Sequence, residues 1–462
     1  MRLSWIVLPC ALALAACTTA VRPVAEPLAR DAGEGLIYVY IRPPAAAGAA
    51  ALPLQSAAVA REDGAELPLR LDLQEIRAGG VPRETLLAHG AVAAGRFSAV
   101  VLRTAEAAEI RVPVAFQLPA RQSAVLSLIP EPPQAVADAR GPFAVELAPR
   151  PAVGVLALVS CPDEGTLALL DKRSGRVGAV VPAGRGVRGI AVDPSRRRAY
   201  VAVAGEDALA AIDLDRAALA EVRATSAGDE PYDLALTPDG RVLVVANFGA
   251  ASVSFVDAES LGEIRRISVG DGPAALVLDN SGRGLFVLNS RASTISVIEV
   301  LARTGDLDPA LVQTFTVEPG PFRARLDRAQ RRLWVIHDGS PYLVEVDAQA
   351  ALGGAAAPVV NRVLLGSPAT AIALDRTDRI HVARRDGTGI DVYDPLSRLP
   401  IDTLPLAGPI AYLALDADND VLGAACGEPP AARAFGLLRR APAWLADIGT
   451  RAGYVAFVGS RP

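Results

Sequence analysis

The chain has 462 residues, of which 51% are hydrophobic and 21% are charged, and its formal net charge is −5 at pH 7. This composition excludes a disordered chain, and the length exceeds what one compact core can hold, so we expect two or three domains, or a large repeat domain with a smaller one. An acidic chain without a basic run argues against nucleic acid as a partner.

The first residues predict export. Arg2 precedes an apolar run, residues 3–16, that is too short to span a bilayer as a mature helix. Leu14-Ala15-Ala16-Cys17 resembles the lipobox of bacterial lipoproteins, which implies a cleaved signal peptide, residues 1–16, and an acylated Cys17. The alternative is an ordinary secretion signal with a chance cysteine.

Sorting of such lipoproteins depends on the residue that follows the acylated cysteine. Because Thr18 stands there and not Asp, the resemblance implies an outer-membrane location, on the periplasmic or the surface face, with the lipid bilayer as a partner through Cys17. Residues 17–34 contain Pro23, Pro27 and small residues without a period, so we expect a lipidated tether.

Residues 35–150 predict a small β-sandwich. About six strands that alternate or run apolar are separated by Pro, Gly or Asp-Gly. The segment GAVAAGRFSAVVLR resembles a domain of unknown function found at the front of bacterial lipoproteins. We expect His89 to be a solvated loop residue and find no site here, so the domain is expected to be a spacer or to dock a partner.

The rest of the chain, residues 151–462, repeats one unit. Residues 232–273 predict four short strands with turns between them, and the same order recurs from residues 188, 274, 322, 370 and 411. A four-strand unit at about 40–50 residues is typical of a β-propeller blade. The first blade, from Val153, lacks its innermost strand, and Tyr454–Val458 can supply it. The predicted fold class is therefore all-β, a seven-bladed propeller preceded by the sandwich.

The stretch VLVVANFGAASVSFVDAESLGEIRRISVGDGP resembles the YVTN-type propeller repeat, and degenerate copies extend this resemblance over about residues 153–458. The family includes periplasmic and cell-surface binding proteins. Similar propellers also occur as sugar-lactone hydrolases and as the haem-carrying half of nitrite reductases. The resemblance therefore implies the fold and leaves the activity open.

Two cysteines remain after Cys10 and Cys17. Cys161 and Cys426 both align with Asn247, and equivalent positions on adjacent blades are about 10 Å apart, whereas a disulfide needs Cα atoms within about 7 Å. Two buried thiols are favoured, and a disulfide across a distorted closure remains the alternative. Acids recur at the strand ends, where we expect them to accept backbone N–H bonds: Asp171, Asp213, Asp257, Glu299, Asp347 and Asp394.

Binding in a propeller usually occurs at one mouth of its central channel. We expect a polar ring there that contacts an anionic ligand through bidentate arginines, the alternative being a solvated loop face. The candidate ligand-binding residues are Arg188, Tyr232, Asn247, Asn289, Arg323, His337, Arg384 and Arg451.

No pattern indicates catalysis. There is no C-x-x-C-H, no G-x-S-x-G and no phosphate-binding glycine loop, and with three histidines in the chain we expect no catalytic residue, metal site or cofactor. The sequence thus predicts a lipoprotein whose propeller is a binding or assembly scaffold for an envelope protein, a glycan or a small anion. Alternatives are a metal-dependent lactonase-like hydrolase and a structural component of an envelope export or polysaccharide system.

Overall fold

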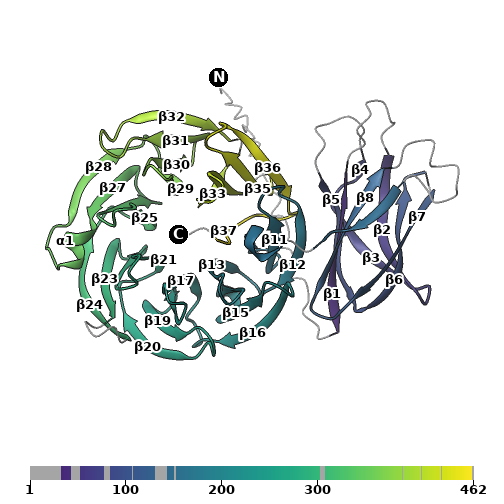
Figure 1. Ribbon diagram of the computed structural model, residues 1–462, viewed down its shortest axis with the longest axis horizontal. Helices are drawn as coiled ribbons and strands as arrows, with labels where there is room; N and C mark the ends of the chain where they lie inside the picture. Colours follow the sequence, from purple (N-terminus) through teal and green to yellow (C-terminus); the bar gives the residue numbers. More distant parts are fainter. Residues whose placement is uncertain are drawn as a thin grey trace, which may run out of the picture.

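The computed structural model describes residues 33–42, 52–76, 84–106, 108–130, 143–149, 152–301, 307–387, 389–406, 408–427 and 429–459 (Figure 1). Cys17, the predicted signal peptide and all but the last residues of the predicted tether lie outside this range. None of the described helices has the length and apolar character needed to cross a bilayer.

The N-terminal domain is one nine-stranded sheet with the order β7-β6-β2-β3-β5-β1-β8-β9, to which β4 adds by pairing with β2. Only β1 and β8 run parallel among these pairs. The strands are β1 (Glu34–Ile41), β2 (Leu52–Arg61), β3 (Glu66–Leu71), β4 (Glu75–Ile76), β5 (Thr85–Ala93), β6 (Gly95–Thr104), β7 (Glu109–Leu118), β8 (Ser123–Pro130) and β9 (Phe143–Leu147).

The predicted sandwich of two sheets is therefore corrected to a single sheet that nearly closes on itself. Its end strands β7 and β9 contact each other. Register shifts in β1, β2 and β6 mark bulges, which bend strands and increase their twist. One continuous sheet can therefore curl around the core. In a sandwich the core would lie between two separate sheets. That core includes Val39, Val59, Leu87 and Phe97, all without exposed surface.

The second domain is a ring of seven four-stranded sheets, as predicted (Figure 1). Blade 1 holds β37 (Val455–Phe457), β10 (Leu156–Cys161), β11 (Thr166–Asp171) and β12 (Val177–Pro182). Blade 2 holds β13 (Val187–Asp193), β14 (Arg198–Val203), β15 (Ala208–Asp213) and β16 (Ala218–Ala224). Blade 3 holds β17 (Pro231–Leu236), β18 (Val242–Asn247), β19 (Ser252–Asp257) and β20 (Glu263–Ser268). Blade 4 holds β21 (Pro273–Leu278), β22 (Gly284–Asn289), β23 (Thr294–Leu301) and β24 (Leu307–Thr316).

The last three blades complete the ring. Blade 5 holds β25 (Pro321–Leu326), β26 (Arg332–His337), β27 (Tyr342–Asp347) and β28 (Val359–Leu364), with α1 (Ala348–Leu352) before its outer strand. Blade 6 holds β29 (Ala369–Leu374), β30 (Ile380–Arg384), β31 (Gly389–Tyr393) and β32 (Pro400–Pro405). Blade 7 holds β33 (Ile410–Asp416), β34 (Val421–Cys426), β35 (Ala431–Gly436) and β36 (Ala441–Asp447).

The two ends of the propeller sequence close the ring in blade 1. The C-terminal β37 pairs antiparallel with β10, so the predicted completion of the first blade is confirmed. The expected role of the periodic acids is confirmed for Asp171, Asp213, Asp257, Asp347 and Asp394, whose side chains accept backbone N–H bonds in the turn that follows.

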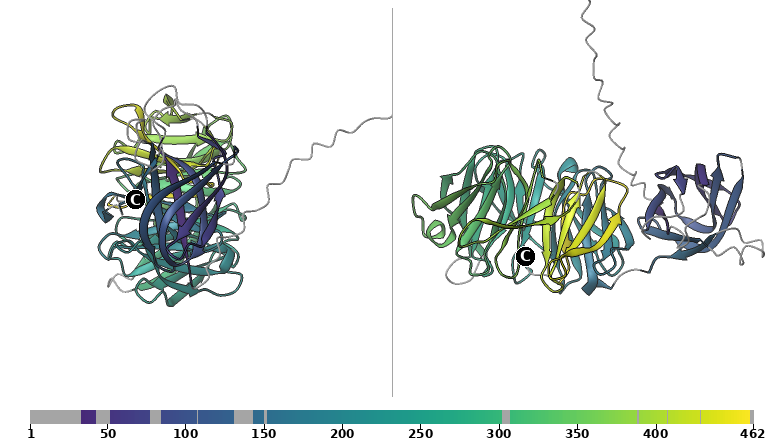
Figure 2. Two further views of the ribbon diagram at one scale, coloured as in Figure 1. Left: turned by 90° about the vertical axis from the view of Figure 1, so that its right-hand side faces the viewer. Right: turned by 90° about the horizontal axis from the view of Figure 1, so that it is seen from above.

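The N-terminal domain packs against the rim of the propeller at the closing blades (Figure 2). One hydrophobic cluster joins Tyr38 and Leu86 of the N-terminal sheet to Val159 and Trp444 of the propeller. The outer strand β12 is buried along its whole length, whereas the outer strands of the other blades are largely exposed. Its sequence VGAVVP is fully apolar because the other domain covers it.

His89 belongs to this interface and corrects the expectation of a solvated loop residue. It lies in β5 with 2% of its surface exposed, its Nδ1 is 2.6 Å from Asp72 Oδ2, and its Nε2 is 3.2 Å from Glu164 Oε1 of the propeller. Burial alone would lower the pKa of His89, but the hydrogen bonds to Asp72 and Glu164 outweigh burial and raise it to about 9. A charged histidine therefore joins the two domains.

Candidate functional site

The innermost strands of blades 2 to 7 share one irregularity close to their second residue. Each breaks register there with the next strand of its blade, which is the pattern of a β-bulge. Bulges re-aim side chains and often lie next to binding sites. In ring order, the residues at this position are Arg188, Tyr232, Ala274, Phe322, Thr370 and Ala411.

Arg323, directly after the bulge of blade 5, reaches across the ring. Its guanidinium carbon lies 4.5 Å from the ring centre of Tyr454 and 5.2 Å from that of Tyr412, and these residues belong to blades 1 and 7. The three residues occupy the same position in their blades. Arg323 and Tyr412 are the first paired residues after the bulge, and Tyr454 is the corresponding residue directly before β37. An arginine held by rings from other blades therefore occupies the axis of the propeller.

The surroundings of Arg323 hold its charge without neutralising it. Arg323 is 8% exposed, its Nη1 donates to the Phe322 carbonyl oxygen at 3.0 Å, and its Nε has no hydrogen-bond partner. Burial alone would lower the pKa of Arg323, but Tyr454, Tyr232 and Asp233 outweigh burial and raise it, so the guanidinium stays charged.

Arg325 adds a second charge two residues further along β25. Its Nη2 donates to Tyr412 Oη at 3.1 Å and to the Leu413 carbonyl oxygen at 3.2 Å. Neither Arg323 nor Arg325 forms an ion pair with any carboxylate in the part of the chain that the structure describes. The residues that share the register position of Arg325 in the other blades are all small or medium apolar ones: Ala191, Ala235, Val277, Ala373, Ala414 and Ala456.

Asp233 is the acid of this axis cluster, which we define as Arg323, Arg325, Asp233, Tyr412 and Tyr454. Its Oδ2 accepts from the Leu276 N–H of blade 4 at 3.0 Å. Burial raises the pKa of Asp233, and the charge of Arg323 opposes that rise. The cluster thus combines two guanidinium groups, one carboxyl and two phenols.

A column of two stacked aromatic rings with an arginine at each end continues from the bulge of blade 3. Arg188 lies over Tyr232 at 4.9 Å, Tyr232 stacks on Phe248 at 5.1 Å, and Arg291 lies over Phe248 at 4.3 Å. The Nε of Arg188 is buried without a hydrogen-bond partner. Of the predicted site residues, the structure thus brings Arg188, Tyr232 and Arg323 to the inner strands around the axis.

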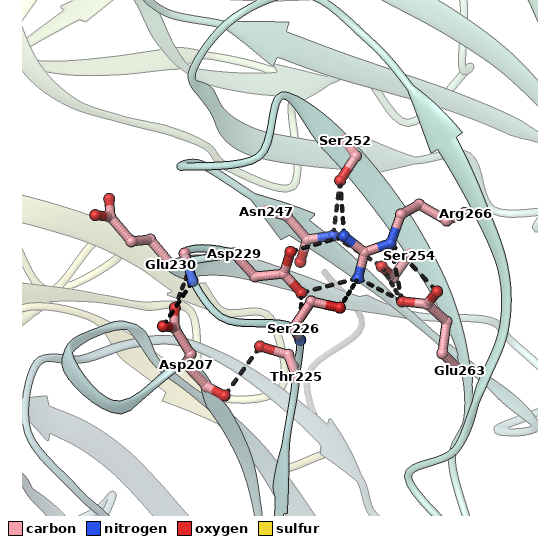
Figure 3. Close-up of polar contacts among 11 residues, drawn as sticks. Asp207, Thr225, Ser226, Asp229, Glu230, Asn247, Ser252, Ser254, Glu263 and Arg266 are labelled. Carbon is pink, nitrogen blue, oxygen red and sulfur yellow. Dashed lines mark hydrogen bonds and ion pairs between the residues drawn. The ribbon is translucent and has the colours of Figure 1, made fainter.

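Asn247, Asn289 and His337 lie elsewhere, inside three separate blades and without exposed surface. The Asn247 amide donates to Ser252 and Ser254, next to the ion pairs of Arg266 with Asp229 and Glu263 (Figure 3). Such amides satisfy hydroxyl groups of the neighbouring strand.

Asn289 follows the same rule, whereas His337 contacts a backbone carbonyl oxygen. The Asn289 amide donates to Thr294 and Ser296, and His337 Nδ1 lies 3.1 Å from the Tyr342 carbonyl oxygen. Burial lowers the pKa of His337 to about 4, so its ring is neutral at pH 7. Sequence reasoning missed the signal, which is a hydroxyl residue five and seven positions after each Asn.

Arg384 and Arg451 already have carboxylate partners. Arg384 Nε is 2.8 Å from Asp391 Oδ2, and Arg451 Nη2 is 2.9 Å from Asp163 Oδ1. Arg384 pairs with Ala369 and so stands at the register position of Asn247.

The two cysteines share that register position as predicted. Cys161 and Cys426 end the second strands of blades 1 and 7, and both are free and buried. Burial raises the pKa of both thiols, which keeps them protonated at pH 7. Among the described residues, no group of three or more His, Cys, Asp or Glu side chains is arranged to hold a metal ion.

Comparison with known proteins supports the propeller. The family model of seven-bladed β-propeller lactonases matches residues 176–321, which include Asp233 but neither Arg323 nor the two tyrosines of the axis cluster. No curated protein matches the chain in sequence.

Three solved structures illustrate the shared fold. Hydrazine synthase of Kuenenia stuttgartiensis is 15% identical with a TM-score of 0.53 and aligns over 62% of this chain and 94% of its own. A protein of unknown function from Desulfotomaculum acetoxidans is 14% identical with a TM-score of 0.56, over 66% and 99%. A Bacteroides fragilis protein with a provisional 6-phosphogluconolactonase assignment is 13% identical with a TM-score of 0.51, over 66% and 98%. At these identities the likeness shows the fold alone.

Proposed function

We propose that the propeller binds a small anionic molecule at its axis, through the guanidinium groups of Arg323 and Arg325. The observation that carries the proposal is that neither group has a carboxylate within ion-pair distance among the described residues, although Arg323 is 8% exposed and Asp233 acts on it only from beyond that distance. A buried charge without a partner is costly, and an anion at the axis would remove that cost. Guanidinium groups suit this role because they bind carboxylate and phosphate groups in bidentate fashion.

The aromatic side chains add shape to the site. Tyr412 and Tyr454 stack on Arg323 and hold its plane, so little side-chain entropy would be lost when an anion binds. The chain carries an excess of acidic residues, so a positive centre in an otherwise negative molecule would select anions by local contacts and not by overall charge.

Arg323→Gln is expected to weaken this binding at least tenfold. Citrate, inorganic phosphate and 6-phosphogluconate would be tested in turn by the shift in melting temperature and by calorimetry. Wild-type protein should be stabilised by at least one of these anions, and the variant should bind it at least tenfold more weakly, because a hydrogen-bonded charge pair contributes about 1.5–3 kcal/mol.

The matched control is Arg216→Gln, since the Arg216 side chain is 80% exposed on an outer turn. That variant should bind as wild type does. Binding at wild-type strength in Arg323→Gln, or a wild-type protein that none of the three anions stabilises, contradicts the proposal.

The location proposed for this binding protein is the outer membrane, with an acylated Cys17 as the anchor. Support comes from the lipobox of residues 14–17 and from Thr18 after it. An acyl chain contributes about 0.8 kcal/mol per buried CH₂, so a multiply acylated cysteine is a firm anchor. Cys17→Ala should move the protein from the membrane fraction to the soluble fraction, as followed by immunoblot, and a variant that stays in the membrane fraction would show the anchor to be wrong.

Lactone hydrolysis is the second candidate, favoured by the family match over residues 176–321 and by the raised pKa of Asp233 beside Arg323. A carboxyl group with a raised pKa can act as a general acid or base, and an arginine can stabilise the charge that develops on a lactone oxygen. Hydrolysis of 6-phosphogluconolactone above the spontaneous rate, lost in Asp233→Asn, would favour the enzyme over the binding protein.

A further inference from the structure

Two adjacent blades depart from a pattern that four of the other five blades share. The turn between the third and fourth strands of these four blades has a polar, exposed residue two positions after the last residue of the third strand. In blades 1, 2, 3 and 5 this residue is Arg173, Asp215, Glu259 and Gln349, and blade 4 has the half-buried Leu301 at the equivalent position. In blades 6 and 7 the equivalent residues are Leu396 and Leu438, with 81% and 87% of their surface exposed. Leucines this exposed at turn tips bury nothing within the fold.

Further apolar side chains adjoin these two tips. Leu399 and Ile401, which continue the blade 6 turn into β32, are 63% and 50% exposed. The turn of blade 7 is tied to the same strand, because Arg440 Nη1 lies 2.6 Å from Asp402 Oδ2. These four exposed side chains of two adjacent blades are here called the leucine patch: Leu396, Leu399, Ile401 and Leu438.

We infer that the leucine patch inserts into the surface of a phospholipid bilayer. The inference rests on the proposed membrane location and adds to it an orientation. Its first support is shape, because Leu396 and Leu438 lie at the turn tips of two neighbouring blades, which suits insertion between lipid headgroups.

The size of the patch supports the same occupant. Four exposed aliphatic side chains offer roughly 400 Å² of apolar surface, whereas a stable protein interface buries about 800 Å² on each partner. The patch is thus too small for a stable dimer face by itself, but insertion of a few aliphatic side chains suffices for a peripheral membrane contact when a second anchor is present.

Charge is the third support. Arg439 follows Leu438 directly, is exposed, and forms no ion pair with a described residue. Arg398 and Arg440 flank the two tips as well, although they pair with Glu345 and Asp402. Arginine beside exposed leucine is the composition of surfaces that bind anionic headgroups while apolar side chains enter the acyl boundary.

The tether explains why such a patch is useful. Gly33 follows Cys17 by 16 residues. These can span at most about 55 Å when extended, which is too long a reach to fix the orientation of the body. An acylated Cys17 would hold the protein near the membrane, and the patch would turn blades 6 and 7 toward it.

The experiment uses the mature chain from residue 18 onward, without an acyl group, so that neither the lipid nor the apolar signal segment contributes to binding. Its sedimentation with vesicles of phosphatidylethanolamine and phosphatidylglycerol is compared between wild type and the double variant Leu396→Ser, Leu438→Ser. Wild type is expected to partition onto vesicles, and the double variant at least tenfold less, because each leucine that enters the bilayer contributes roughly a tenfold factor.

Leu311→Ser is the matched control, since Leu311 is 46% exposed on β24 of a distant blade and should bind as wild type does. Three results would overturn the inference: no binding by wild type, equal loss in the control, or loss of binding in high salt with no effect of the leucines. Size-exclusion chromatography with light scattering can give a fourth contradicting result. If the wild type is a dimer and the double variant a monomer, the patch is a self-association face. Failure of the Cys17→Ala fractionation bears only on the anchor, since these vesicle measurements contain no acyl group.

Discussion

Lys172→Met is expected to lower the free energy of unfolding by about 3 kcal/mol, because it removes the ammonium group that pairs with a buried carboxylate. Lys172 is the one lysine of the sequence, and its side chain is 3% exposed. Its Nζ lies 3.2 Å from Asp416 Oδ1, 3.4 Å from Asp418 Oδ2 and 3.1 Å from the Val458 carbonyl oxygen. One ammonium group thus joins the first blade, the last blade and the C-terminal segment where the ring closes.

The measurement is urea unfolding followed by tryptophan fluorescence, to which Trp444 and Trp334 contribute. The indole of Trp444 donates to the Lys172 carbonyl oxygen at 2.8 Å and so reports on the same closure. Asp416 keeps other donors, Asn419 Nδ2 at 2.6 Å and the Asp418 N–H at 3.2 Å, which is why we expect the low end of the usual 3–5 kcal/mol for a broken buried pair.

Arg197→Met is the control for Lys172→Met. Arg197 pairs with Asp215 at 2.9 Å, but these side chains are 62% and 50% exposed, so the loss should stay below about 1 kcal/mol. A second variant, Lys172→Met with Asp416→Asn, should regain part of the lost stability because the buried carboxylate is then replaced by a neutral amide and only the exposed Asp418 loses its cation. Equal effects of Lys172→Met and Arg197→Met would show that the ring closure does not depend on this ion pair.

The repeat could be predicted because each blade carries its own local signals. Apolar strands and strand-end acids recur with one period, and aligning them gave the incomplete first blade its C-terminal strand and placed Cys161 and Cys426 in one register. The N-terminal domain offered no repeat. Six strands with turns are compatible with a sandwich or a closing sheet, and the choice depends on bulges and long-range pairing that single-sequence patterns do not encode.

The axis cluster was found only in part, although β25 carries a signal for it. The segment Pro321–Leu326 holds Arg323 and Arg325 where other inner strands have Gly, Ala, Val, Asp or Tyr. Sequence reasoning selected Arg323 and missed Arg325, Asp233, Tyr412 and Tyr454, because a ring brings together residues from blades that are far apart in sequence. Once the strand register of each blade is known, these residues apart from Arg325 are seen to lie at matching positions around the axis.

The docked domain also changes how the histidines are interpreted. From a single sequence, a lone His can be interpreted only from the residues near it in the chain, which suggest a loop residue or a metal ligand. The carboxylates that decide the state of His89 come from residue 72 and, across the domain boundary, from residue 164. That information is absent from its neighbourhood in the sequence and appears only with the tertiary structure.

His89 is expected to make the stability of the protein fall as pH rises from about 6.5 to about 9. Its pKa is about 9 in the folded protein against 6.5 for an ordinary histidine. A group whose pKa is raised on folding contributes stability that is complete below the unfolded pKa and is lost as pH passes the folded pKa. The difference corresponds to about 3 kcal/mol. Tyr38, which stacks on His89 at 5.4 Å, does not titrate in this window, because burial and the charge of Glu164 raise its pKa well above 10.

The direct check is titration of the ring protons of the three histidines by NMR, in which one should titrate near pH 9 and one, His337, near pH 4. Urea unfolding at pH 6.5 and pH 9.5 gives the energetic counterpart. His89→Leu should remove most of the difference between the two pH values and lower stability at pH 6.5, since Asp72 and Glu164 then lose their shared cation. Glu164→Gln keeps the packing of the interface but removes the carboxylate from the propeller, so it should shift the His89 titration to lower pH. A contradicting result would be a His89 titration near pH 6.5 in the wild type with no loss of stability up to pH 9.5. The hydrophobic cluster alone would then hold the two domains together, and the ion pairs of His89 with Asp72 and Glu164 would add nothing to the free energy of unfolding.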